Sequence, residues 1–264
     1  MILKLIIILF LLMLFVGADR GLTSFFTLVR TVIAFTVNVY LIAWGLPAIP
    51  ITLIISAFLI ISVIYGQNGR NAKMHGAAAS AALVVVIIMI TIGPILHIAG
   101  ISGYNEIEQY EEISMYLSAN VSVSMAAVAV SATVLGVLGA VMDTAVAVST
   151  AVNEVYVNNP SLDRKTLVSS GMAVGKDILG TTVNTLLFAG FGESIMLANL
   201  FLKNENTFYE IINSKALFQE VSALFVAVMG CLLVIPLASI LTPWFIEKTK
   251  KMEEKQNEIC DTES

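Results

Sequence analysis

The sequence predicts an all-α fold, a polytopic membrane helix bundle with about seven transmembrane helices, and three features of the chain indicate it. Hydrophobic residues make up 58% of the 264 residues and charged residues only 12%, whereas a soluble domain is about a quarter charged. The apolar residues fall in blocks of roughly 15 to 25, the length that spans a bilayer core. The stretches between the blocks are too short to fold as separate soluble domains.

Each apolar block is interpreted as one helix, because clusters of proline, glycine and asparagine separate the blocks. The predicted helices cover residues 3–16, 24–44, 48–65, 76–98, 119–153, 177–200 and 216–245. A cleavable signal peptide within residues 1–18 is the alternative to a first membrane helix. Residues 1–246 therefore form a single predicted transmembrane helix-bundle domain. The charged residues 247–264 form a predicted cytoplasmic tail without stable structure.

The segment between the fifth and sixth predicted helices contains a chain break followed by a possible short helix. Asn158, Asn159 and Pro160 end the fifth helix. Ser161 is expected to be the N-cap of the next one. Leu162–Gly175 is then predicted to be an amphipathic helix on the membrane surface.

Orientation follows from the Lys and Arg residues, which are retained on the cytoplasmic side. With seven crossings and the C-terminus inside, the external segments hold only Lys4, Lys203 and Lys215. The external segment 101–118 is acidic. We therefore expect the N-terminus outside and the C-terminus inside. The cytoplasmic segments then hold Arg20, Arg30, Arg70, Lys73, Arg164, Lys165, Lys176, Lys248, Lys250, Lys251 and Lys255.

Asp143 is the ionisable residue that is hardest to explain as a surface group. It precedes Glu154, at the cytoplasmic end of the fifth predicted helix, by about 11 residues, which puts it roughly 16 Å into a core of about 30 Å. An acid at that depth costs about 3 kcal/mol on insertion scales, so such residues usually face a partner or a water-filled cavity. Asp143 is therefore a candidate protonatable group, and a structural, hydrogen-bonded acid is the alternative.

Small residues share the helix face of Asp143. At helical spacing from it lie Gly136, Gly139, Ala140 and Ala147. Because small residues let two helices approach closely, these four predict a helix-packing seam.

The sixth predicted helix carries a matching polar face, with Asp177, Thr181, Asn184 and Thr185 at helical spacing. Asn184 can donate a hydrogen bond to an ionised Asp143 or accept one from its protonated form. We therefore expect Asp143 to face the bundle within reach of Asn184. Glu193, toward the outer end, could continue a proton route. The predicted proton-relay residues are thus Asp143, Asn184, Thr185 and Glu193, and interhelical hydrogen bonding alone is the alternative.

The sequence lacks the residues that phosphate binding, hydrolytic catalysis, metal binding or nucleic-acid binding would require. Gly171–Lys176 resembles a phosphate-binding loop, but its glycine spacing is one residue short and Asp177 replaces the required Ser or Thr. The sequence contains no Ser–His–Asp set, no Cys/His metal cluster and no basic stripe with interleaved aromatics. We expect no enzymatic activity, no cofactor, no metal and no nucleic-acid partner.

Two stretches, Gly136–Glu154 and Gly171–Leu186, resemble the YibE/F family of bacterial membrane proteins. The connecting residues Asn159–Lys165 and Ile212–Lys215 fit the same family, and the likeness covers most of residues 15–240. The resemblance implies a multi-pass protein of the bacterial cytoplasmic membrane. The short external segments are similar to those of the smaller, YibF-type members, which implies a YibE-type membrane partner; a homo-oligomer is the alternative.

A more distant likeness concerns mechanism. Asp143–Glu154 and Thr182–Thr185 resemble two membrane helices of the SecD/SecF export proteins. Those proteins use proton flow through intramembrane polar residues, and their relatives in the RND superfamily pump small molecules. The resemblance implies a proton-relay role for Asp143, Asn184 and Thr185. The chain differs in having no large external domain and no Arg after Asp143 comparable to that of the family.

These observations lead to one functional hypothesis and one alternative. The hypothesis is a membrane-embedded subunit of a proton-coupled transport or export assembly, in which Asp143 titrates. The alternative is a non-transporting membrane scaffold that stabilises a partner membrane protein.

Overall fold

The computed structural model describes residues 2–98, 124–203 and 206–262, and these residues form helices with no strand among them. Six of the helices are long and apolar enough to cross a membrane, and only the short α7 is not. The prediction of an all-α polytopic helix bundle is confirmed. The acidic segment 101–118 and residues 119–123 of the fifth predicted helix lie outside the described residues. The elements are α1 (Ile2–Ala43), α2 (Ala48–Asn68), α3 (Ala72–Ile98), α5 (Met125–Asn158), α6 (Arg164–Lys203), α7 (Phe208–Ile212) and α8 (Lys215–Thr262).

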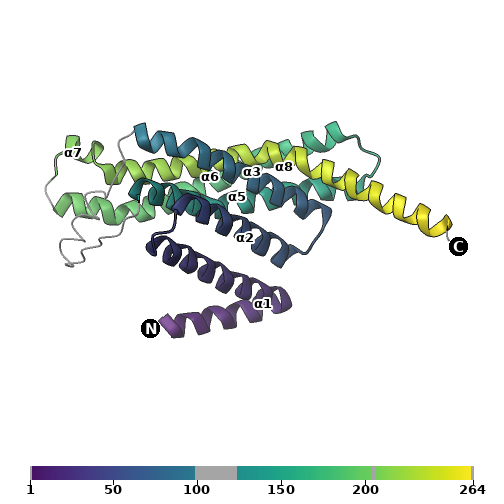
Figure 1. The fold of residues 1–264 in the computed structure, drawn as a ribbon, viewed down its shortest axis with the longest axis horizontal. Coiled ribbons are helices and arrows are strands. Elements are labelled where there is room, and N and C mark those ends of the chain that lie inside the picture. Colours follow the sequence, from purple (N-terminus) through teal and green to yellow (C-terminus); the bar gives the residue numbers. More distant parts are fainter. Residues whose placement is uncertain (1, 99–123, 204–205, 263–264) are drawn as a thin grey trace.

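Helix α1 contains both of the first two predicted helices. It bends back on itself at Ala18, where φ is 44°, as the V-shaped ribbon of Figure 1 shows. Gly21 lies against the backbone carbonyl of Met13 with no room for a Cβ atom. Beyond this contact the Phe10 and Phe25 rings pack edge to face at 4.9 Å. The six membrane-length helices therefore comprise seven helical segments, as predicted, although the first arm is only about 24 Å long.

The seven segments alternate in direction. Figure 1 places the N-terminus and the C-terminus at opposite ends of the molecule, and α7 lies at the end opposite the C-terminus. The connections at Gly69 and at Asn159 lie at the same end as the C-terminus. This alternation is what the predicted topology requires, and which end faces the cytoplasm stays a prediction.

Helices α3, α5, α6 and α8 form the core of the bundle, and α8 contacts each of the other three. Small residues on these helices allow the close approach. A Cβ atom on Gly76 of α3 would lie 2.7 Å from the Cα atom of Thr242 in α8. A Cβ atom on Gly230 of α8 would lie 2.9 Å from the side chain of Val141 in α5. The apolar core around these contacts is buried on all sides, so the orientation of each of these helices is set by packing.

Helix α1 joins the bundle chiefly through α2. Asn38 of α1 is buried, and its side-chain oxygen accepts a hydrogen bond of 3.3 Å from the hydroxyl of Thr52 in α2. Apart from such contacts most of α1 is exposed, including Phe15 and Val16. An exposed apolar helix of this kind is suited to a lipid environment.

The prediction of a separate surface helix over Leu162–Gly175 is wrong. Helix α6 runs without interruption from Arg164 to Lys203. Its first half is held against the bundle, because Gly171 and Gly175 are buried against the Ser239 and Ile235 side chains of α8. The glycines make the segment weakly apolar in composition, which favoured the prediction of a surface helix. In the fold they instead allow α6 to pack closely against α8.

The expected N-cap at Ser161 is also wrong. The Ser161 hydroxyl donates instead to the Asn159 side chain. Asp163 takes the capping role, because its carboxylate accepts a 3.2 Å hydrogen bond from the Thr166 backbone N–H.

Helix α8 is longer than the bilayer requires. It continues to Thr262, so residues 247–262, which we expected to lack stable structure, are helical. With 48 residues it measures about 72 Å. Its last part therefore extends well beyond the bundle at the C-terminal end, where Figure 1 shows it projecting alone.

Candidate functional site

Asp143 lies near the middle of α5, but it does not face the interior of this chain. Its side chain is exposed on the outer surface of the bundle. Gly136 and Gly139, on the same face, are exposed too, and a Cβ atom on either would meet no described atom within 4 Å. The expectation that Asp143 faces the bundle is therefore wrong for the single chain. The buried face of α5 is instead formed by residues such as Val141, Ala145 and Val148.

The polar face of α6 is also exposed. Asp177, Thr181, Asn184 and Thr185 all lie at the surface. The threonine hydroxyls bond to their own helix: Thr181 donates to the Ile178 carbonyl at 2.8 Å, and Thr185 donates to the Thr181 carbonyl at 2.9 Å. Within the described part of the chain no hydrogen bond joins Asn184 to Asp143. Their predicted contact is not formed.

The two polar faces nevertheless lie at the same level of the bundle. A Cβ atom on Gly171 of α6 would lie 2.6 Å from the Val152 side chain of α5, which fixes the register of this antiparallel pair. Asp143 precedes Val152 by nine residues, and Gly180 follows Gly171 by nine residues. Because the two helices are antiparallel, Asp143 of α5 is level with Gly180 of α6. Asn184 is about 6 Å further along the helix axis, level with Gly139.

Because α8 packs against both α5 and α6 on one side of the pair, their exposed residues lie on the other side. We call this surface the outer polar face. It consists of Gly136, Gly139 and Asp143 of α5 and of Gly180, Thr181, Asn184 and Thr185 of α6. A carboxyl at mid-helix depth is costly in lipid. The outer polar face is therefore better suited to contact with another polar surface than with acyl chains.

Ala140 and Ala147, the other two residues of the predicted seam, are half-buried at the edge of this face. Together with Gly136 and Gly139 they form a surface of α5 from which no large side chain projects. The predicted seam does not form within the described chain, so it stays a prediction for contact with a second chain.

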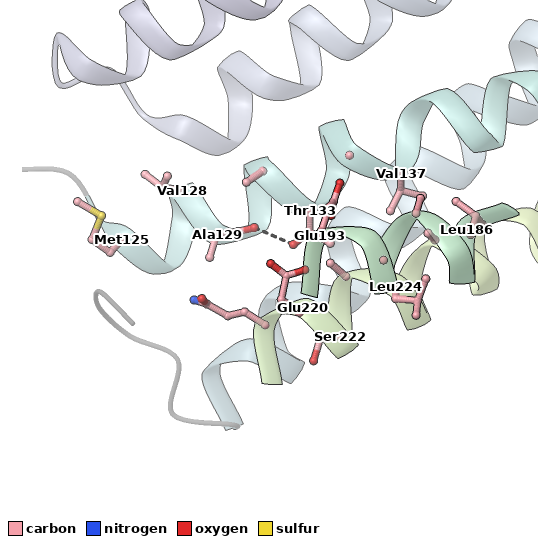
Figure 2. A pocket seen from close by; sticks show the side chains of 17 residues that line it. Met125, Val128, Ala129, Thr133, Val137, Leu186, Glu193, Glu220, Ser222 and Leu224 are labelled. Atoms are coloured by element: carbon pink, nitrogen blue, oxygen red, sulfur yellow. Dashed lines mark hydrogen bonds between the residues drawn. The ribbon is translucent and has the colours of Figure 1, made fainter. Parts of the chain in front are cut away.

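Glu193 lies apart from the outer polar face. The same register puts it about 20 Å from Asp143 along the helix axis. Its carboxylate lines a pocket of about 470 Å³ between α5, α6 and α8. Figure 2 shows Thr133 beside it, Glu220 of α8 below it, and Leu186 and Leu224 to the right, all of them lining the same pocket. The structure does not join Glu193 to Asp143 and Asn184 in one polar chain.

Sequence reasoning missed Glu220, because an acid near the start of a predicted helix gives no indication of which residues face it.

Sequence reasoning also missed the partner of His75. The Tyr65 hydroxyl of α2 and the His75 Nδ1 atom of α3 are 2.8 Å apart in a hydrogen bond, near the connection between these helices. The His75 ring also lies 6.0 Å from the ring of Phe245 in α8. The side chain of His97 lies outside those that the structure describes.

The length of the helices, their apolar exposed surface and the acid at mid-helix define the class of this molecule as a polytopic α-helical membrane protein. Comparison with protein families then identifies the family. The chain belongs to the YibE/F family, because the model of that family, described as YibE/F-like protein, matches residues 5–248. A search of curated proteins found no match, and a search of solved structures found none.

Proposed function

We propose that this protein is a membrane-embedded subunit of a proton-coupled transport or export assembly in the bacterial cytoplasmic membrane, with Asp143 as the titrating group. One observation carries the proposal: Asp143 is exposed near the middle of a membrane-length helix, on a face where the described residues supply no hydrogen-bond or ion-pair partner. Such an acid usually faces a partner or a water-filled path.

The chemistry follows from the outer polar face. A second membrane protein that covers this face would enclose Asp143 between two chains, close to Thr181 and Asn184. A carboxyl group held there can accept and release a proton, and an amide such as Asn184 can hydrogen-bond to either protonation state. The resemblance of these two helix segments to those of SecD/SecF supports the same role. A YibE-type protein is the proposed partner, and a second copy of this chain is the alternative. The proposal includes no enzymatic reaction, cofactor or nucleic acid.

The test is proton flux in vesicles that contain the assembly purified from native membrane. Asp143→Asn keeps the size of the protonated acid but cannot ionise. We expect this variant to insert and assemble normally and to lose proton flux. Glu154→Gln removes an exposed acid near the end of the same helix and should retain most of the flux. Full flux in the Asp143→Asn assembly would contradict the proposal.

The second candidate function is a non-transporting scaffold. The helix surface around Gly136 and Gly139, from which no large side chain projects, favours it. Glycine residues without neighbours let a foreign helix approach closely. A scaffold predicts that the partner is lost from native membranes when this chain is absent. It also predicts that wild-type and Asp143→Asn assemblies are alike in showing no proton flux.

A further inference from the structure

We propose that the pocket between α5, α6 and α8 binds an organic monovalent cation with an apolar body. The pocket encloses about 470 Å³, which lies within the range of small-molecule sites. Its lining meets the outer polar face at Gly136, but no step of the proposed proton chemistry uses Glu193 or Glu220.

Two carboxylates define the polar part of the pocket. Glu193 enters from α6 and Glu220 from α8, and both are among the lining residues drawn in Figure 2. Both side chains are acidic, so the polar part of the pocket is negative when they are ionised. No ion pair with a Lys, Arg or His is found for either of them within the described ranges. A bound positive charge would compensate this negative charge.

The remaining lining is largely apolar and built from small residues. Leu186 and Leu224 form apolar walls, and Ala189 and Gly190 of α6 leave the space between them open. A Cβ atom on Gly190 would come within 3.4 Å of Leu224, so a larger residue there would begin to fill the pocket. The Thr133 hydroxyl is bonded to the Ala129 carbonyl at 2.9 Å and is not free to hold an ion. Such a lining suits an apolar body better than a hydrated ion.

The ligand donors also favour an organic cation over a metal ion. A divalent metal ion in a protein usually takes four or more ligands. No group of three or more His, Cys, Asp or Glu residues is gathered for this purpose in the described ranges. Two carboxylates in an apolar pocket instead match a weakly hydrated cation whose charge is shielded by apolar groups.

The experiment measures binding of tetraphenylphosphonium to the purified full-length chain in neutral detergent by equilibrium dialysis. Tetraphenylborate, which has the same shape and the opposite charge, is the matched probe. We expect saturable binding of the cation and none of the anion. The double variant Glu193→Gln/Glu220→Gln should bind the cation at least about tenfold more weakly. Glu154→Gln, outside the pocket, should bind like the wild type.

A second variant tests the space rather than the charge. Ala189→Phe would fill the pocket from α6 without removing a carboxylate, and it too should weaken cation binding about tenfold. This variant decides the matter if the double glutamine variant does not fold. Absence of saturable cation binding to the wild type, equal binding of the anion, or unchanged affinity in a folded pocket variant would each overturn the proposal.

The two proposals can fail separately. Dialysis in detergent involves no proton gradient, and Asp143 lies about 20 Å from Glu193 along the helix axis. Asp143→Asn is therefore expected to bind tetraphenylphosphonium like the wild type even where it loses proton flux. A loss of cation binding in Asp143→Asn would contradict a separate site.

Discussion

The Thr242 hydroxyl of α8 donates a hydrogen bond of 2.8 Å to the Ser149 hydroxyl of α5, and both side chains are fully buried. The bond lies beside Gly76 of α3, so three helices meet at this point. Ser149 is six residues after Asp143 and on a different side of α5. The bond therefore helps to fix the rotation of α5 that leaves Asp143 on the outer surface.

Thr242→Val removes the donor of this bond and leaves the Ser149 hydroxyl without it in a buried position. We expect the free energy of unfolding in detergent to fall by about 0.6–2 kcal/mol. Thr181→Val is the control, because Thr181 is exposed and its hydroxyl bonds only to the backbone of its own helix. Equal effects of the two substitutions on unfolding would contradict this account.

Glycines of α5 and α6 should divide into two classes when each is replaced by leucine. A side chain at Gly175 would overlap Ile235 of α8, so Gly175→Leu should destabilise the monomer by about 1–3 kcal/mol. Gly139 has free space around it, so Gly139→Leu should not destabilise the monomer.

The same pair of variants tests the outer polar face. If a second chain covers this face, Gly139→Leu should reduce recovery of the assembly from native membrane, measured by size-exclusion chromatography after mild solubilisation. An assembly of normal size and yield would show that the surface around Gly139 is not an interface.

The start of α6 should depend on pH through Asp163. Hydrogen bonds from the Thr166 hydroxyl and the Thr166 backbone N–H lower the pKa of this carboxyl from its usual value of about 3.9. The folded state therefore releases the proton more readily than the unfolded state. The stabilisation is present above the usual pKa and is lost as the pH falls through the lowered pKa of the folded state.

The measurement is the hydrogen-exchange protection factor of the Thr166 amide between about pH 3 and pH 6, a range that brackets the usual carboxyl pKa. Wild-type protection should decline toward the acid end of this range. Asp163→Asn keeps a good N-cap that does not titrate, so its protection should vary much less. The same acid-dependent decline in both proteins would rule out this role for the carboxylate.

The predicted topology can be tested at two sites that the structure places at opposite ends of the bundle. Asn159→Cys and Tyr209→Cys, each made in a chain without Cys260, put an exposed thiol in the α5–α6 connection and in α7. Cys231 is buried and should not react. With the C-terminus inside, an impermeant thiol reagent added outside intact cells should label position 209 and not position 159. The reverse pattern would invert the orientation, and labelling of both would refute the alternating arrangement.

The helices themselves were predictable because blocks of apolar residues of bilayer length permit few other structures. Their boundaries were less predictable where local composition and tertiary packing disagree. The interval around Gly171 and Gly175 resembles a surface helix by composition. In the fold these glycines allow α6 to lie close to α8, and the helix continues through them.

The candidate site shows a different limit. The spacing of Gly136, Gly139 and Asp143 correctly places them on one face of α5, since helical periodicity is a local property. Which face the rest of the chain covers depends on α2, α3, α6 and α8, and small residues suit contact within a chain as well as contact between chains. Periodicity alone assigned the face to the interior. The pairing of Glu193 with Glu220 likewise depends on tertiary structure, because no local pattern relates the two helices.

The length of α8 has a mechanical consequence. Its middle is held by contacts with α3, α5 and α6, while its last turns project beyond the bundle. A helix of about 72 Å that pivots on its buried part acts as a lever. A change of tilt too small to break the contacts around Thr242 would move the far end by a larger distance. Any rearrangement of the bundle within the bilayer would thus be amplified at the end of α8 that projects beyond it.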